Sequence, residues 1–167
     1  HDDIEIISDE NQFLQCLIKE LLIKENTGFV GVAGTKELTE SGVWWDQNKW
    51  KENKHSGFVL HGKRLTDSYS TYYGPYGEVV VMDGLFLAAT AKTIRRINLG
   101  KPDYLSEDWD FYDLHYTLSA HKIGLKNRVV PIFILHNSSG ELAGRESWHN
   151  NRLAFLKKHQ KSFPITI

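Results

Sequence analysis

Residues 108–136 read DWDFYDLHYTLSAHKIGLKNRVVPIFILH, and this stretch decides the fold. Asp108 or Asp110 can cap a helix that a glycine ends, because short polar side chains accept hydrogen bonds from the free N–H groups of a first helical turn. The run VVPIFIL that follows is too short to span a membrane and rich in β-branched residues, so it predicts a strand, with Pro131 at its start or on a sheet edge. An acid at the helix start and His136 at the strand end can then meet in one pocket.

Composition limits the classes of protein to consider. A chain of 167 residues predicts a single domain over 1–167, large enough to bury roughly 70% of its unfolded surface. Its 20 basic and 21 acidic residues leave a net charge of -1, so no global field holds nucleic acid or an anionic membrane. The single cysteine, Cys16, forms no internal disulfide and indicates a reducing compartment. The sequence has no apolar run long enough for a transmembrane helix.

The rest of the chain alternates strands with helices, which indicates an α/β domain. Ser8 or Asp9 can cap a helix that runs to about Lys24, and Asp9 and Gln12 have capping-box spacing. The apolar face of this helix consists of Phe13, Leu14, Leu17, Ile18, Leu21 and Leu22. An amphipathic helix is predicted over 145–161 and a basic helical or turn segment over 92–98. Buried strands are predicted over 28–34, 57–63 and 78–90, and loops over 40–55 and 68–77.

Candidate metal ligands lie where strands end. The first residues read HDD, and the carboxylates of Asp2 and Asp3 suit a hard divalent cation such as Mg²⁺ or Mn²⁺. A solvated terminus explains the same residues without a metal. His136 offers a further ligand, or else bonds to backbone.

Two further carboxylates are candidates for acid–base chemistry. Asp113 lies in the first turns of the predicted helix, where it can act as a general base or merely stabilise the helix dipole. Asp83 interrupts the apolar run VVVMDGLFLA, so its carboxylate needs a partner or a cavity. The aromatic loops that hold Trp44–Trp50 and Tyr69–Tyr76 can pack against the body or stack on sugars.

In order along the chain, these motifs resemble a known pattern. From Val79 to Gly140 the sequence is similar to the acceptor-side half of GT-A glycosyltransferases of the family 2 type, and in particular to the glycosyltransferase-like family that includes streptomycin-biosynthesis-protein-like domains. The segments that carry the resemblance are a strand into DG at Asp83 and Gly84, IRRI, YLSEDWDF, YDLHYTLSAHKIG and a strand into HNSSG. Before them, HDDIEI resembles the metal motif of the family, and GVAGTKELTESGVWW resembles the strand and Trp loop that follow it.

The resemblance implies a partial GT-A-like fold, a mixed sheet flanked by helices, and sugar transfer from a nucleotide-sugar donor to a saccharide or lipid-linked acceptor. It assigns metal binding (Mn²⁺ or Mg²⁺) to Asp3, Asp2 and His136, and the base for inverting attack to Asp113. It places the remaining candidates, Asp83, Gly84, Trp109 and Tyr112, around the donor and acceptor.

The sequence also departs from the family pattern. His1 stands where the metal motif has its first acid, and Tyr112 precedes Asp113 where the family has a Glu-Asp pair. The nucleotide-binding βαβ half that precedes the metal motif in the family does not occur in 1–167. We therefore expect that residues 1–167 correspond to the C-terminal part of such a transferase. We also expect that this part does not bind donor alone as a monomer.

The function expected from the sequence is glycosyl transfer in polysaccharide or glycoconjugate synthesis in the bacterial cytoplasm, without nucleic acid as a partner. A homo-oligomer and a membrane-peripheral location are compatible with it. Two alternatives stay open. One is a non-catalytic carbohydrate-binding or assembly module that uses the aromatic loops, and the other is a metal-dependent hydrolase, which needs at least three well-placed ligands.

Overall fold

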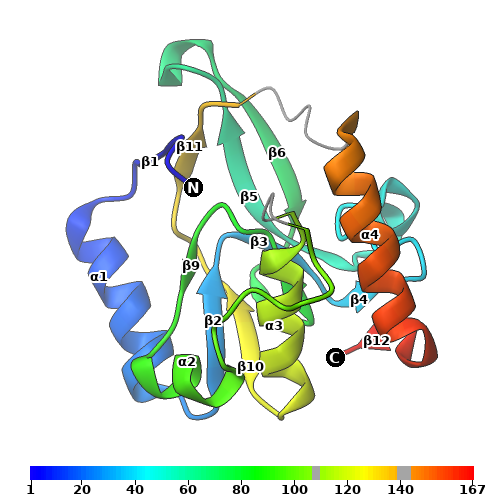
Figure 1. The fold of residues 1–167 in the computed structure, drawn as a ribbon. Coiled ribbons are helices and arrows are strands. Elements are labelled where there is room, and N and C mark those ends of the chain that lie inside the picture. Colours follow the sequence, from blue (N-terminus) through cyan, green and yellow to red (C-terminus); the bar gives the residue numbers. More distant parts are fainter. Residues whose placement is uncertain (107–109, 139–143) are drawn as a thin grey trace.

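The computed structural model describes residues 1–106, 110–138 and 144–167 (Figure 1). Its strands and helices are, in chain order, β1 (Ile4–Ile6), α1 (Glu10–Ile18), the π-helical turn η1 (Lys19–Ile23), β2 (Thr27–Gly31), β3 (Ala33–Thr35), β4 (Glu37–Leu38), the 3-10 helix η2 (Gln47–Glu52), β5 (His55–His61), η3 (Leu65–Asp67), β6 (Tyr69–Gly74), β7 (Gly77–Val79), β8 (Val81–Met82), β9 (Leu87–Ala88), α2 (Ala91–Ile97), α3 (Tyr112–Lys122), β10 (Lys126–Val129), β11 (Ile134–His136), α4 (Glu146–His159), η5 (Gln160–Ser162) and β12 (Ile165–Thr166).

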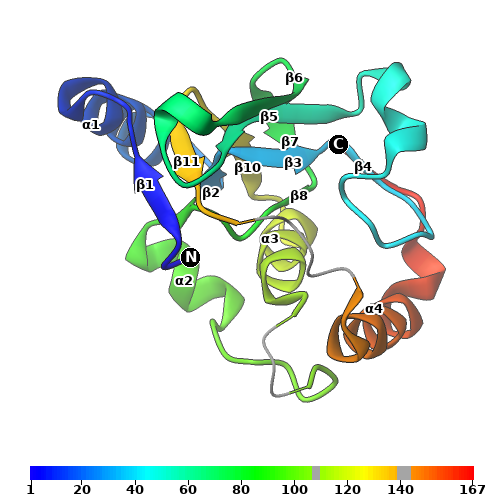
Figure 2. The same ribbon diagram turned by 90° about the horizontal axis from the view of Figure 1, so that it is seen from above.

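Two mixed sheets form the centre of the molecule. One has the order β1-β11-β5-β3-β8 with β6 paired to β5, and the other has the order β7-β10-β2-β9. The pairs β10–β2 and β11–β5 are parallel, whereas the neighbouring pairs are antiparallel. Helices α2, α3 and α4 lie on one side of the strands, and α1 lies at the far side from α4 (Figure 2). This confirms the predicted α/β class with a mixed sheet flanked by helices.

Three runs that the sequence predicts as single strands are each divided between the two sheets. The chain leaves the four-stranded sheet and joins the other one between β2 and β3, between β7 and β8, and between β10 and β11. The first two bends are at Val32 and Val80, which are fully buried and continue the apolar pattern, so the sequence does not reveal them. At the third bend Pro131, which has no N–H to donate, separates β10 from β11.

The prediction of a loop over 68–77 is wrong. Residues Tyr69–Gly74 form β6, an antiparallel partner of β5 in a long hairpin. Tyrosine and threonine favour extended backbone, and the turn-forming residues begin only at Gly74.

The predicted cap of the central helix is also wrong at Asp110, and Asp108 lies outside the described residues. The cap position is Phe111, which has a left-handed backbone (φ 69°) and no side-chain capping bond. Asp110 instead binds the start of α4: its Oδ1 is 2.8 Å from Arg145 Nη2 and its Oδ2 accepts from Ser147 Oγ at 2.9 Å. Asp110 therefore connects the start of α3 to the start of α4 and does not cap α3.

The first helix begins as predicted, but only half of its apolar face packs on the core. Asp9 Oδ1 accepts from the N–H groups of Asn11 and Gln12, which confirms the cap. The members that pack on the core are Phe13, Leu17 and Leu21, whereas the side chains of Leu14, Ile18 and Leu22 are 45%, 47% and 74% exposed. In the part of the chain that the structure describes, no helix is long and apolar enough to cross a membrane.

One buried amide joins α3 to the sheets. Asn127 on β10 is fully buried, and its Nδ2 donates to the carbonyl oxygens of Val80 and Thr117, each at 2.8 Å. Its Oδ1 accepts from Phe29 N–H at 3.1 Å. The position of α3, which carries Asp113, is thereby fixed against β2 and the β7–β8 bend.

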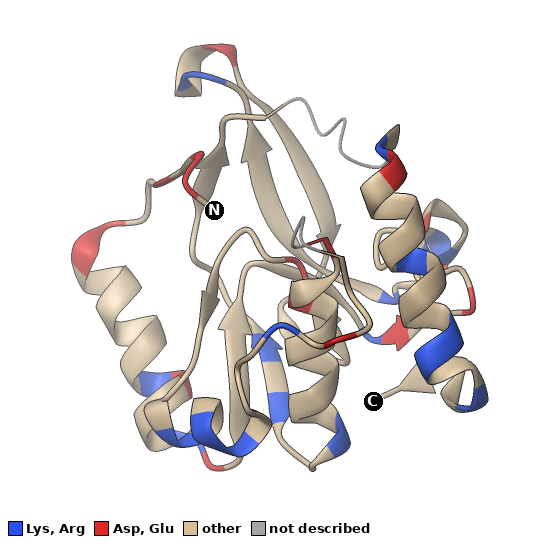
Figure 3. Ribbon diagram, in the orientation of Figure 1, with Lys and Arg blue, Asp and Glu red and all other residues tan. Residues whose placement is uncertain are grey.

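Charges are separated along the molecule although the net charge is close to zero. In Figure 3 basic residues gather on η1, α2, the end of α3 and the start of β10, at the lower end of the view. Acidic residues lie near the N-terminus and at the start of α3, in the upper half. The net charge of the sequence predicts only the overall field, so it does not reveal this local distribution of charge.

Candidate functional site

A pocket of about 280 Å³ opens between the N-terminus, the ends of β5 and β11, and the starts of α3 and α4. Two groups of ionisable side chains line it. One contains His1, His61 and His136, and the other contains Asp83 and Asp113. The structure thus brings a strand-end histidine and the helix acid into one pocket, as the order of motifs predicts.

The first group is built by strand pairing. β1 runs antiparallel to β11 with Ile4 opposite His136, so Asp3 lies beside the histidine, and Asp3 Oδ2 is 3.2 Å from His136 Nε2. Asp3 Oδ1 is 3.3 Å from His1 Nδ1. Among the described residues, His1, Asp3 and His136 form a group whose potential ligand atoms all lie within 4.8 Å of one another.

This donor set fits a divalent transition metal better than Mg²⁺. Two imidazoles and one carboxylate offer nitrogen and oxygen, whereas Mg²⁺ prefers oxygen ligands alone. Asp3 Oδ1 and His136 Nδ1 are buried and make no hydrogen bond within the described part of the chain. Buried polar atoms in proteins nearly always have a partner, so these two atoms are suited to an added ligand.

Sequence reasoning missed His61. In the parallel pair β5–β11 it stands directly beside His136, and the two rings are 5.6 Å apart. Burial lowers the pKa of His61, and His136 lowers it further. The sequence places His61 at the end of a predicted strand, but nothing in it shows that this strand pairs in parallel with β11.

The second group consists of two carboxylates in the pocket wall. Asp83 accepts from Trp44 Nε1 at 3.0 Å through Oδ2 and from Leu85 N–H at 2.9 Å through Oδ1. Asp113 accepts from Gly84 N–H at 2.8 Å through Oδ2 and from Leu114 N–H at 2.8 Å through Oδ1. Asp83, which interrupts the apolar run of the sequence, therefore has hydrogen-bond partners as expected.

Burial favours the neutral form of both carboxylates. Burial, and then the charge of Asp83, raise the pKa of Asp113 to about 7, against the bonds from Gly84 and Leu114. Burial also raises the pKa of Asp83, while the N–H groups of Leu85 and Trp44 oppose the rise. A carboxyl group with a pKa near neutrality can both take up and release a proton under ordinary conditions.

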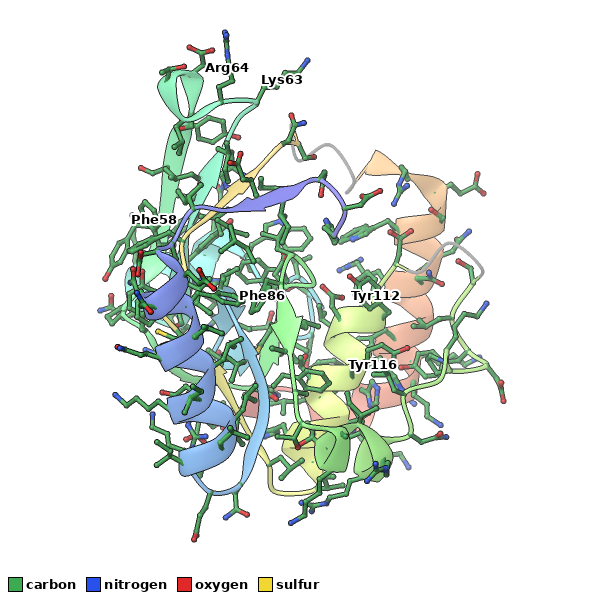
Figure 4. The ribbon with its side chains drawn as sticks, turned by 90° about the vertical axis from the view of Figure 1, so that its left-hand side faces the viewer. Phe58, Lys63, Arg64, Phe86, Tyr112 and Tyr116 are labelled. Atoms are coloured by element: carbon green, nitrogen blue, oxygen red, sulfur yellow. The ribbon has the colours of Figure 1, made fainter. Side chains whose placement is uncertain are left out.

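Gly84 and Tyr112 fit closely against this pair. A Cβ atom on Gly84 would lie 2.3 Å from Tyr112 Oη and 3.1 Å from Asp113 Cβ, which no side chain permits. Tyr112 begins α3 one turn before Tyr116 and lines the pocket (Figure 4). Gly84 itself contributes its N–H to Asp113 rather than a pocket surface.

The aromatic residues have unequal roles. Trp44 is buried at 2% exposure and packs on Tyr73 with ring centres 5.0 Å apart, so its indole is a wall of the pocket and not an open platform. Trp50 stacks on the other side of Tyr73 at 5.4 Å. Tyr69 and Tyr72 are each 60% exposed.

Two predicted site residues are not part of this arrangement as described. Asp2 is exposed and does not belong to the group of His1, Asp3 and His136. Trp109 lies outside the described residues.

Comparison with known proteins adds a match over nearly the whole chain. A family model described as a glycosyltransferase-like family matches residues 1–160. The chain belongs to this family. No curated protein matches it. Membership of the glycosyltransferase-like family supports a function of the glycosyltransferase kind, which involves a nucleotide-sugar donor and an acceptor in general.

Proposed function

We propose that this member of the glycosyltransferase-like family transfers a sugar from a nucleotide-sugar donor to an acceptor hydroxyl with inversion, in the manner of GT-A enzymes, and that the pocket is its active site. The observation that carries the proposal is the meeting of a candidate metal group and a buried acid pair in one pocket. An inverting transfer needs positive charge near the leaving diphosphate and a base near the acceptor, and the two groups can supply these functions within one pocket.

Asp113 is the base in this proposal. It lines the pocket, and its raised pKa suits removal of a proton from an acceptor hydroxyl. The N–H groups of Gly84 and Leu114 hold both carboxylate oxygens, so the group is positioned before substrate binds. Asp83 lies beside it and adjusts its pKa.

Three residues, His1, Asp3 and His136, would hold the metal. A bound divalent ion supplies charge neutralisation for a diphosphate leaving group. The mixed nitrogen and oxygen set favours Mn²⁺ over Mg²⁺. Asp2 lies outside this group and has no role in this proposal.

Tyr112 and Trp44 shape the acceptor side. Tyr112 presents its ring next to Asp113, and burial together with that charge raises the pKa of its phenol, so the hydroxyl stays protonated. Trp44 closes the wall behind Asp83. Apolar rings beside a carboxylate are a common surface for one face of a sugar.

A metal-dependent hydrolase is the second candidate. His1, Asp3 and His136 meet its requirement for three clustered ligands, which the sequence alone did not provide. The family match favours transfer, and the products distinguish the two reactions. A hydrolase releases free sugar at the full rate of donor consumption, whereas a transferase needs an acceptor.

Calorimetric titration of UDP and GDP into the purified chain, first with Mn²⁺ and then with EDTA, tests the donor site. We expect metal-dependent nucleotide binding, either by this chain or only by the extended form described next, and we expect it to weaken in Asp3→Ala. The same titration is made on a form of the chain extended before His1, because the family has a nucleotide-binding half before the metal motif. No metal-dependent binding by either form would contradict the proposal and favour a carbohydrate-binding module.

Asp113→Asn tests the base separately. The amide keeps the shape and can still accept one of the two N–H bonds through its single oxygen, but it cannot take a proton. Nucleotide binding should therefore be unchanged, while transfer to an acceptor falls by at least about a hundredfold. Transfer at the original rate would exclude Asp113 as the base.

A further inference from the structure

The lower end of the molecule in Figure 3 carries a surface that the proposed reaction does not use. It consists of η1 with the residues just after it, α2, the end of α3 and the start of β10, and we call it the basal surface. Its exposed cations are Lys19, Lys24, Lys92, Arg95, Arg96, Lys122 and Lys126. The pocket lies in the other half of the molecule, so these cations do not serve it.

Few acids offset the charge of the basal surface. In residues 19–27, 91–100 and 119–128 the acids are Glu20 and Glu25, and Glu78 on the neighbouring strand β7 pairs with Lys126 at 3.0 Å. Glu20 is buried and already bonded to Lys24 at 2.7 Å. Arg95 and Arg96 make no ion pair with any residue that the structure describes. Their charge is therefore available to a partner.

The same surface exposes aliphatic side chains. Leu22 and Ile23 are 74% and 71% exposed, more than any other large hydrophobic side chain in the described ranges. The bond from Lys24 N–H to Lys19 C=O closes the π-helical turn that presents them, so their exposure follows from a formed element and not from a loose end. Leu99 and Ile123 add further exposed aliphatic surface beside the cations of α2 and α3.

We propose that the basal surface docks on an anionic lipid bilayer, with Arg95 and Arg96 among the cations at the headgroups and Leu22 and Ile23 inserted between them. Cations around exposed aliphatic side chains match the two layers of a membrane interface, because headgroups attract the charge and the acyl boundary takes up the apolar tips. A nucleic acid offers phosphate without an apolar layer, so it would leave Leu22 and Ile23 in water. Docking of this kind leaves the pocket clear of the bilayer.

The hairpin tip provides a matched control at the opposite end. Lys63 and Arg64 are adjacent exposed cations there, as Figure 4 shows, and Leu65 beside them is 55% exposed. The test uses flotation of the full chain with phosphatidylcholine vesicles, with and without about 30% phosphatidylglycerol. We expect flotation only with the anionic vesicles, and less of it in about 0.5 M NaCl.

Three double variants and one single variant locate the surface. Arg95→Glu with Arg96→Glu, and Leu22→Ser with Ile23→Ser, should each reduce vesicle affinity by roughly tenfold or more. Lys63→Glu with Arg64→Glu, which makes the same change of charge, and Leu65→Ser should leave it unchanged. All four replace exposed side chains, and circular dichroism verifies that they fold.

Three outcomes would overturn the proposal. They are no binding to anionic vesicles, loss of binding in the tip variants instead of the basal ones, and binding of an RNA or DNA duplex in preference to vesicles with no effect of Leu22→Ser and Ile23→Ser. None of them bears on nucleotide binding, so this inference and the proposed function fail or stand separately.

Discussion

At the scale of single residues, the acid pair decides how the site responds to pH. Asp83 and Asp113 are held in the same wall by backbone and indole N–H groups, yet burial favours their neutral forms. The charge of one raises the pKa of the other, so neither titrates alone. The pair therefore behaves as one unit that carries a proton up to neutral pH.

This proton has a measurable effect on stability. The pKa of Asp113 rises from 3.8 to about 7 on folding, so between these values the native state holds a proton that the unfolded state has lost. The free energy of unfolding should therefore fall as pH rises through this window. Above about 7 both states have lost the proton, so Asp113 causes no further fall. Urea denaturation at a series of pH values measures it, and Asp113→Asn should flatten this part of the curve.

A second variant tests the coupling. Because the charge of Asp83 contributes to the raised pKa of Asp113, Asp83→Asn should move the fall in stability to lower pH. Asp103→Asn alters an exposed acid that does not contribute to the pKa of Asp113, and it should leave the curve in place. A curve that keeps its position in Asp83→Asn would show that burial alone sets the pKa.

Gly84 is required by close contact, not by an unusual backbone. Gly84→Ala places a methyl group against Tyr112 Oη and Asp113 Cβ, so the start of α3 must move. We expect a loss of stability of about 1–3 kcal/mol together with a loss of transfer activity. Gly77→Ala is the control, since a Cβ there meets nothing within 4 Å. Unchanged activity in Gly84→Ala would show that the contact is dispensable.

At the scale of elements, Asn127 holds the helix of the base onto the sheets. Asn127→Ala removes the side-chain partner of one N–H and two C=O groups at a fully buried position, so we expect a loss of about 3 kcal/mol or more, measured by chemical denaturation. Asn150→Ala changes an exposed amide on α4 and should cost less than about 0.5 kcal/mol. Similar losses in both variants would contradict the structural role of Asn127.

The elements also show what the sequence could and could not predict. Helices over 10–23 and 146–159 were predictable because their apolar spacing and, for the first, its cap are local. The cap at Asp110 failed because its partners are on α4, 35 or more residues away. The sequence does not reveal β6 because Gly74, Pro75 and Gly77, which are typical of turns, directly follow its tyrosines.

The same distinction applies to the site. Asp83 and His136 were identifiable because they interrupt or end an apolar run. Asp3 was identifiable from the acids before the first strand, and Asp113 from its place in the first turns of the predicted helix. His61 ends a predicted strand as well, but its proximity to His136 depends on a parallel pairing between strands that are 70 residues or more apart in sequence. The bends at Val32 and Val80 bring these runs together and have no local signature.

At the scale of the whole molecule, metal binding should stabilise the fold, because His1 and Asp3 precede β1 whereas His136 ends β11, far away in the sequence. Mn²⁺ at a hundred times its dissociation constant should raise the melting temperature by about 5–10 °C, and EDTA should reverse the rise. Asp3→Ala and His136→Ala should abolish the shift, whereas Asp2→Ala should retain it. An equal shift in all of these variants would place the metal elsewhere.

The indole of Trp44 has a consequence for experiments on this protein. Its N–H is bonded to Asp83, and its ring forms a pocket wall against Tyr73. Indole fluorescence depends on the charge and the water near the ring, so ionisation of the acid and arrival of a ligand both reach the fluorophore directly. The fluorescence of Trp44 should therefore report on the pocket without an attached dye. A difference spectrum between the protein and its Trp44→Phe variant isolates the Trp44 emission.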